Sequence, residues 1–134
     1  MALWLFKQEP DDFSYADLEA AGSTVWDGVA NPVAQKHLRS VRPGDQAFFY
    51  HTGNEKAVVG VMEVVGGPKP DPENEKLVVV EVKPVRRLKA PVTLAAIKAD
   101  GAFADWELVR VPRLSVMPVS PVLWKRIEAM AGKS

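Results

Sequence analysis

Apolar residues recur along this chain in two kinds of pattern. Compact runs rich in Val, Leu and aromatic side chains are typical of buried strands, and they occur at residues 4–6, 46–52, 57–65 and 77–85. A further extended segment is predicted at 114–119. The remaining apolar residues are spaced three or four apart, which favours short amphipathic helices.

Capping residues mark where these helices begin. Asn31 precedes Pro32, which the first turn of a helix tolerates, and apolar side chains then repeat at helical spacing as far as Val41. The predicted helix starts are Ser14, Asn31, Thr93, Asp105 and Ser120. In contrast, residues 66–72 hold three prolines and two glycines, so this segment is predicted to be a loop without ladder pairing.

Short strands joined by turns, with small helices around them, predict an α+β fold in which a mixed or antiparallel sheet of about five to six strands curls into a barrel. With 134 residues the chain has a common size for one domain, so we expect a single domain over 1–134. Four aromatic residues within apolar segments are predicted to lie in the core: Trp4, Phe48, Phe49 and Trp124.

Charge does not favour binding to nucleic acid by bulk attraction, because 17 basic residues balance 17 acidic ones. The basic residues nevertheless fall into three groups along the chain. These are Lys36, Arg39 and Arg42; then Lys83, Arg86, Arg87 and Lys89; then Arg110 and Arg113. They could form one positive face, or they could be solvated charges scattered over the surface.

Catalytic and metal-binding motifs are missing from the sequence. There is no cysteine, no nucleotide-binding glycine motif and no hydrolase signature, and His37 and His51 are the only histidines. We therefore expect no enzyme activity, no cofactor and no metal site. No apolar run is long enough to cross a bilayer and no signal peptide is evident, so we expect no membrane association, a cytoplasmic or nucleoid location, and a monomer.

Two stretches place aromatic rings beside hydrogen-bonding groups, as in a pocket for a flat polar ring. These stretches belong to a set of four ordered phrases that resembles the EVE domain, a member of the PUA-like group of nucleic-acid-binding folds. The phrases are Trp4-Leu5-Phe6-Lys7-Gln8-Glu9-Pro10; Trp26-Asp27-Gly28-Val29-Ala30-Asn31 with Leu38-Arg39; Gly44-Asp45 with Phe49-Tyr50-His51-Thr52; and Leu108-Val109-Arg110 with Arg113-Leu114-Ser115-Val116 and Pro118-Val119. The resemblance covers most of the chain.

The resemblance implies a PUA-like barrel with a pocket for a modified base, as in the related YTH readers. The implied ligand is DNA that carries methylated or hydroxymethylated cytosine. Alternatives are an RNA-binding module or accessory of an RNA-modifying enzyme, and a module that binds a small molecule or a protein. A base taken out of its stack must regain stacking on aromatic faces and hydrogen bonds to its polar edge.

Site roles follow from this hypothesis. Trp26 and Tyr50 would be walls for the base, Asn31 would read its edge, His51 would bond the base or sugar, and Ser115 would close the pocket. The predicted phosphate contacts are Lys7, Arg39 and Arg113.

Each role has a simpler alternative. Trp26 is as readily a core residue, Asn31 a helix cap, His51 a satisfied half-buried histidine, and Arg39 the partner of an acid. The sequence also departs from the family pattern, because Gln8 replaces the common Ser, Ala30 a frequent Arg, and Pro32 a larger residue.

Overall fold

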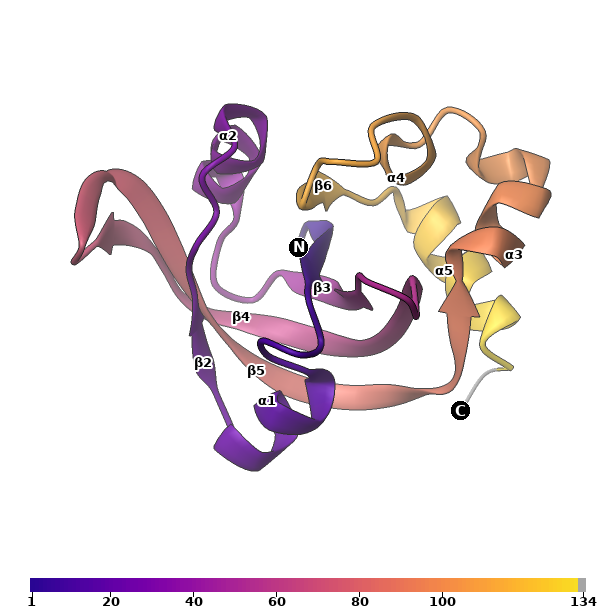
Figure 1. The fold of residues 1–134 in the computed structure, drawn as a ribbon, viewed down its shortest axis with the longest axis horizontal. Helices are drawn as coiled ribbons and strands as arrows, with labels where there is room; N and C mark the ends of the chain where they lie inside the picture. The colour runs from indigo at the N-terminus through magenta and orange to yellow at the C-terminus, as the bar shows by residue number, and fades with distance from the viewer. Residues whose placement is uncertain (133–134) are drawn as a thin grey trace.

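A computed structural model describes residues 1–132, and it has a single mixed sheet with short helices around it (Figure 1). The strands are β1 (Leu3–Gln8), β2 (Thr24–Trp26), β3 (Gln46–His51), β4 (Ala57–Asp71), β5 (Asn74–Thr93) and β6 (Val116–Pro118). The helices are α1 (Tyr15–Ala21), α2 (Pro32–Ser40), α3 (Leu94–Ala99), α4 (Glu107–Arg110) and α5 (Pro121–Met130), with a 3₁₀ turn, η1, at Gly101–Phe103.

The sheet has the order β2-β5-β4-β3-β1-β6. Only β1 and β3 run parallel, and the other neighbours are antiparallel. The expected α+β class is confirmed, whereas the expected barrel is wrong in one respect, because no hydrogen bonds join β2 to β6. Helix α2 contacts both β5 and β6, so a helix covers the opening between the two ends of the sheet. Figure 1 shows α2 between the β4–β5 hairpin and β6.

The helices begin where local capping groups satisfy free backbone N–H groups. The Ser14 side chain accepts from the backbone N–H of Asp17, and the Asp17 side chain accepts from that of Ser14, which completes a capping box. The side chains of Asn31, Thr93 and Ser120 accept from backbone N–H groups at the starts of α2, α3 and α5. Asp105, in contrast, does not cap α4, whose first flanking residue is Trp106.

The segment 66–72 differs from the predicted loop, because β4 continues through it to Asp71. Lys69 and Pro70 lie opposite Val79 and Val78 of β5, and register shifts interrupt the ladder on both sides. Prolines are tolerated here because β3 pairs with β4 only as far as Glu63, so among residues 1–132 one edge of this half of β4 has no strand beside it.

The core lies on both faces of the sheet. The rings of Phe48 and Trp124 stack at a centroid distance of 3.7 Å, on the face that α5 covers. On the other face, Phe49 packs edge-to-face with Tyr15 of α1 at 5.4 Å. The four aromatic residues predicted to be core are all at most 7% exposed, so this prediction is confirmed.

Candidate functional site

The parallel pair β1 and β3 brings several predicted site residues together. Lys7 lies opposite Tyr50 and Gln8 opposite His51, at the ends of the two strands. The backbone N–H of Lys7 also donates to the carbonyl of Ser115 at 2.9 Å. Two distant phrases of the sequence thus meet here, together with the loop before β6.

Trp26 and Tyr50 do not face a common pocket. The Trp26 ring packs against Phe6 at 5.4 Å and against Phe49 at 5.2 Å. Because successive side chains of a strand point to opposite faces, Tyr50 points away from the face that carries Phe49 and Trp26. Tyr50 instead lies beneath the Lys7 ammonium, which is 5.4 Å from the ring centroid. The sheet separates the two expected walls, which corrects the arrangement predicted from the sequence.

A cleft of about 290 Å³ opens on the Trp26 side of the sheet. It lies between the end of β1, the turn before α1, and β2. Its lining residues are Gln8, Asp12, Phe13, Thr24, Val25, Trp26 and Asp27. Ligand pockets start at roughly 300 Å³, so the cleft has room for a small flat group. Trp26 is the one predicted pocket residue that lines it, and at 3% exposed it is also the core residue that the simpler alternative describes.

Two polar residues of this cleft were not predicted as site residues. The Gln8 side-chain oxygen accepts from the backbone N–H of Glu9 at 3.0 Å, which leaves its two amide N–H groups available. Asp27 is exposed, and its carboxylate has no hydrogen bond or ion pair within residues 1–132. The departure from the family's Ser at position 8 could have identified Gln8 as a site residue. Asp27 precedes a glycine, as in an ordinary turn, so its sequence context did not single it out.

His51 uses both ring nitrogens inside the fold. Its Nε2 accepts from the backbone N–H of Tyr15 at 3.1 Å, and its Nδ1 lies 2.7 Å from a Glu55 carboxylate oxygen. Because a backbone N–H requires an acceptor, Nδ1 carries the proton in this arrangement and donates it to Glu55. His51 is only 8% exposed. The structure therefore gives the simpler alternative, a satisfied and mostly buried histidine.

Asn31 also takes its simpler role. Its side-chain oxygen accepts from the backbone N–H groups of Val33 and Ala34 at 2.9 and 3.1 Å, which caps α2. Pro32 fills the first position of that helix, where a larger residue is frequent in the family. The departures at Ala30 and Pro32 lie outside the lining of the cleft, whereas Gln8 lies within it.

The predicted phosphate contacts have different surroundings. The Lys7 ammonium donates to the carbonyl of Pro112 at 2.9 Å, and burial lowers its pKa. The guanidinium of Arg39 donates to the carbonyl of Lys76 at 2.7 Å, rather than to an acid. Arg113 is exposed and has no ion-pair partner in the described part of the chain. Of the three, Arg113 has the cation most available for a ligand.

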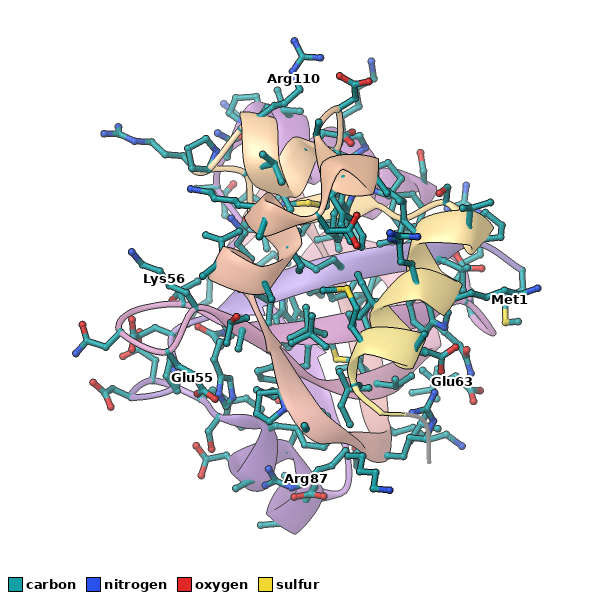
Figure 2. The ribbon with its side chains drawn as sticks, turned by 90° about the vertical axis from the view of Figure 1, so that its right-hand side faces the viewer. Met1, Glu55, Lys56, Glu63, Arg87 and Arg110 are labelled. Atoms are coloured by element: carbon teal, nitrogen blue, oxygen red, sulfur yellow. The ribbon has the colours of Figure 1, made fainter. Side chains whose placement is uncertain are left out.

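The basic groups do not gather on one face. Arg110 and Arg87 lie at opposite ends of the molecule, and Arg87 is beside α1 (Figure 2). Arg87 pairs with Glu19 at 2.8 Å, and Arg86 pairs with Glu128. These acids neutralise two of the four basic residues between Lys83 and Lys89. The alternative of charges scattered over the surface therefore describes the protein better than one positive face.

The Tyr50 hydroxyl is protonated at neutral pH. It belongs to a residue that is 2% exposed, and burial raises the pKa of Tyr50 to about 12.

No helix within residues 1–132 is both long and apolar enough to span a bilayer. The same residues contain no cluster of three or more potential ligand side chains for a metal ion.

Comparison with known proteins gives consistent matches. The family model described as "EVE domain" matches residues 2–130. Human thymocyte nuclear protein 1 is 31% identical over an alignment of 153 residues, which covers 87% of this chain and 68% of that protein. The chicken protein of the same name is 33% identical, and the chain spans 63% of its length.

Solved structures show the same fold. A Rhodopseudomonas palustris protein solved by NMR has a TM-score of 0.94 and 41% identity, over 98% of this chain and 94% of that one. Human THYN1, crystallised in complex with DNA that contains 5-methylcytosine, has a TM-score of 0.88 and 27% identity. That match covers 100% of this chain and 99% of the human one.

Proposed function

Because the chain belongs to the EVE domain family, we propose that it binds DNA by holding one modified cytosine in the cleft beside Trp26, without chemical turnover. The observation that carries this proposal is an indole-lined cleft of about 290 Å³ in a chain similar to human THYN1. The structure of that relative contains 5-methylcytosine DNA.

The cleft offers what an unstacked base requires. Stacking on an aromatic side chain contributes roughly 1–3 kcal/mol per base. The half-buried Phe13 is the ring available for such a contact, because Trp26 lines the cleft but is only 3% exposed. The polar edge of the base also needs partners, because an unpaired buried polar group costs about 1–3 kcal/mol. Gln8, Thr24 and Asp27 place such groups around the same space.

The charge of the protein fits a pocket-based mode of binding. The 17 basic and 17 acidic residues cancel, and several arginines are already paired within the fold. Attraction to the phosphate backbone is therefore weak, and the affinity should depend less on salt than that of a basic protein. Arg113, in the loop before β6, is our candidate for a positioning contact to phosphate.

The test is equilibrium binding of short DNA and RNA oligonucleotides that differ in one base, cytosine or 5-methylcytosine, at two salt concentrations. Thr24→Phe adds a ring to a strand residue that lines the cleft, and should abolish the preference for the modified base. Val122→Phe adds the same ring on α5, where Val122 is 74% exposed, and should leave binding unchanged.

Three results would contradict the proposal. Equal affinity for both bases with a steep salt dependence would indicate backbone attraction alone. Tighter binding of RNA than of DNA would identify an RNA-binding module. The absence of binding to any oligonucleotide would remove nucleic acid as the ligand.

A further inference from the structure

We infer that Asp27 and Gln8 read the edge of the base, selecting a ring that carries an amino group beside an acceptor nitrogen and rejecting one that carries a carbonyl oxygen beside an N–H. This inference rests on the proposed function, since it assigns the specificity of the same cleft. It concerns the 4-position and N3 of a pyrimidine and is independent of the substituent at C5.

Asp27 supplies an acceptor that nothing within residues 1–132 occupies. It directly follows Trp26 at the end of β2, and both residues line the cleft. An ionised carboxylate has only acceptor oxygens, so it can receive an amino group but not a carbonyl. Because the side chain is exposed and unpaired in the described residues, its role in folding is small.

Gln8 supplies the donor. An isolated glutamine amide can present either its oxygen or its N–H groups to a ligand, but here the backbone N–H of Glu9 occupies the oxygen at 3.0 Å. The oxygen keeps a second lone pair, but the bond to Glu9 fixes its direction. The two amide N–H groups, which have no partner within residues 1–132, are the donors that this side chain offers a ligand. The cleft therefore combines an acceptor from the residue after β2 with a donor from the last residue of β1.

Cytosine matches this pair. Its amino group donates and its N3 accepts, whereas thymine and uracil present the opposite pattern of a carbonyl oxygen and an N–H. A keto base would place its oxygen against the Asp27 carboxylate and its N–H against the Gln8 amide. Mismatched polar groups in a binding site produce discrimination that stacking alone does not provide.

The sharpest comparison uses 5-methylcytosine and thymine, because the two bases share the methyl group and ring shape and differ only at this edge. We expect the wild-type protein to bind a 5-methylcytosine oligonucleotide roughly five- to 150-fold more tightly than the thymine equivalent, the range that one well-placed pair of hydrogen bonds gives. An adenine oligonucleotide is included because adenine also carries an amino group beside a ring nitrogen.

Asp27→Asn should reduce the ratio of the two affinities at least fivefold, since an asparagine amide can face either edge. Gln8→Glu keeps an acceptor for Glu9 but removes the donor, and it should lower the ratio in the same direction. Asp12→Asn tests the other carboxylate that lines the cleft. Asp11→Asn is the matched control, because Asp11 is exposed, loses the same charge and lies outside the lining of the cleft. It should change the affinity for both oligonucleotides equally and leave their ratio unchanged.

The outcomes separate this inference from the proposed function. If the wild type prefers 5-methylcytosine but Asp27→Asn keeps the full ratio, the assignment of Asp27 is overturned while the reader function stands. If Asp12→Asn alone lowers the ratio, the acceptor is Asp12. Adenine bound as tightly as 5-methylcytosine would overturn the restriction to the 4-position and N3 of a pyrimidine, because adenine carries the same amino group beside an acceptor nitrogen. If the wild type binds no oligonucleotide, both proposals fail together.

Discussion

The backbone N–H of Tyr15 donates a hydrogen bond of 3.1 Å to Nε2 of His51, which joins the first turn of α1 to the end of β3. Both residues are buried, so water cannot replace either partner. This bond holds α1, and with it the turn that contributes Asp12 and Phe13 to the cleft. His51 thus positions the cleft wall and lies outside the residues that line the cleft.

His51→Ala should destabilise the protein by about 1–3 kcal/mol, because it leaves the Tyr15 N–H buried without an acceptor. Urea unfolding followed by tryptophan fluorescence measures this change. Glu55→Gln is the control, since an amide oxygen can still accept from Nδ1 of His51 and the Glu55 side chain is 42% exposed. An unchanged midpoint for His51→Ala would show that the bond contributes nothing.

Asn31→Ala should lower stability by about 0.5–2 kcal/mol through loss of the α2 cap, with no change in affinity for a modified-base oligonucleotide. Asn31→Asp keeps an oxygen for the N–H groups of Val33 and Ala34, and should retain most of the stability. Thermal unfolding and oligonucleotide binding are measured on the same samples. A loss of affinity in a variant that is still folded would restore Asn31 as a residue that reads the base.

Local signals in the sequence were enough to predict much of the fold. Ser14, Asn31 and Ser120 were identified as helix starts because a cap depends on groups within a few residues along the chain. The strand 46–52 was predicted because a run of apolar and aromatic residues identifies a strand buried on both faces. These features need no knowledge of distant contacts.

Features that depend on distant pairing were not predictable in this way. The extension of β4 to Asp71 depends on β5, which supplies a partner despite the prolines. The separation of Trp26 from Tyr50 depends on the face of the sheet to which each side chain points, and the spacing of the two residues in the sequence carries no information on this. Family resemblance indicated that both phrases belong near the site, but it did not indicate which side chains share one surface.

Asp45→Asn should destabilise the protein at neutral pH by about 1–3 kcal/mol, because one carboxylate oxygen accepts from both the Trp4 indole N–H and the Arg42 backbone N–H. In Asp45→Asn an amide NH₂ in the place of that oxygen would be a donor facing the two N–H donors of Trp4 and Arg42. Replacement of Trp4 by Phe removes only one of these donors and should have a smaller effect. Urea unfolding of the two variants and the wild type measures the difference.

The Asp45 effect should also depend on pH. Burial acts to raise the pKa of Asp45, but hydrogen bonds from Ala2, Trp4 and Arg42 outweigh it and hold the pKa below 3.8. A carboxyl with a depressed pKa stabilises the fold fully above its unfolded pKa of about 3.9, and this stabilisation is lost as the pH falls through the folded pKa. The gap between wild type and Asp45→Asn should therefore narrow in acid. A difference in stability that stays constant as the pH falls would contradict a depressed pKa of Asp45 in the folded protein.

Gly60→Ala should destabilise the protein by about 1–3 kcal/mol through overpacking. A Cβ atom at position 60 would lie 2.6 Å from Cζ and 2.8 Å from Cδ1 of the Tyr15 ring. That ring cannot shift easily, because it is fully buried and its hydroxyl lies 2.7 Å from the carbonyl oxygen of Val61. Gly101→Ala, where an added Cβ meets open space, should change stability by no more than about 0.5 kcal/mol.

A double-mutant cycle with Tyr15→Leu tests the cause of the Gly60 effect. Removing the ring should make Gly60→Ala nearly neutral, although Tyr15→Leu itself destabilises the fold. If Gly60→Ala lowers the free energy of unfolding equally in both backgrounds, the need for glycine at position 60 comes from the backbone of β4 and not from the Tyr15 ring. Tyr15→Leu keeps the backbone N–H that donates to His51, so the cycle measures the coupling of the side chain alone.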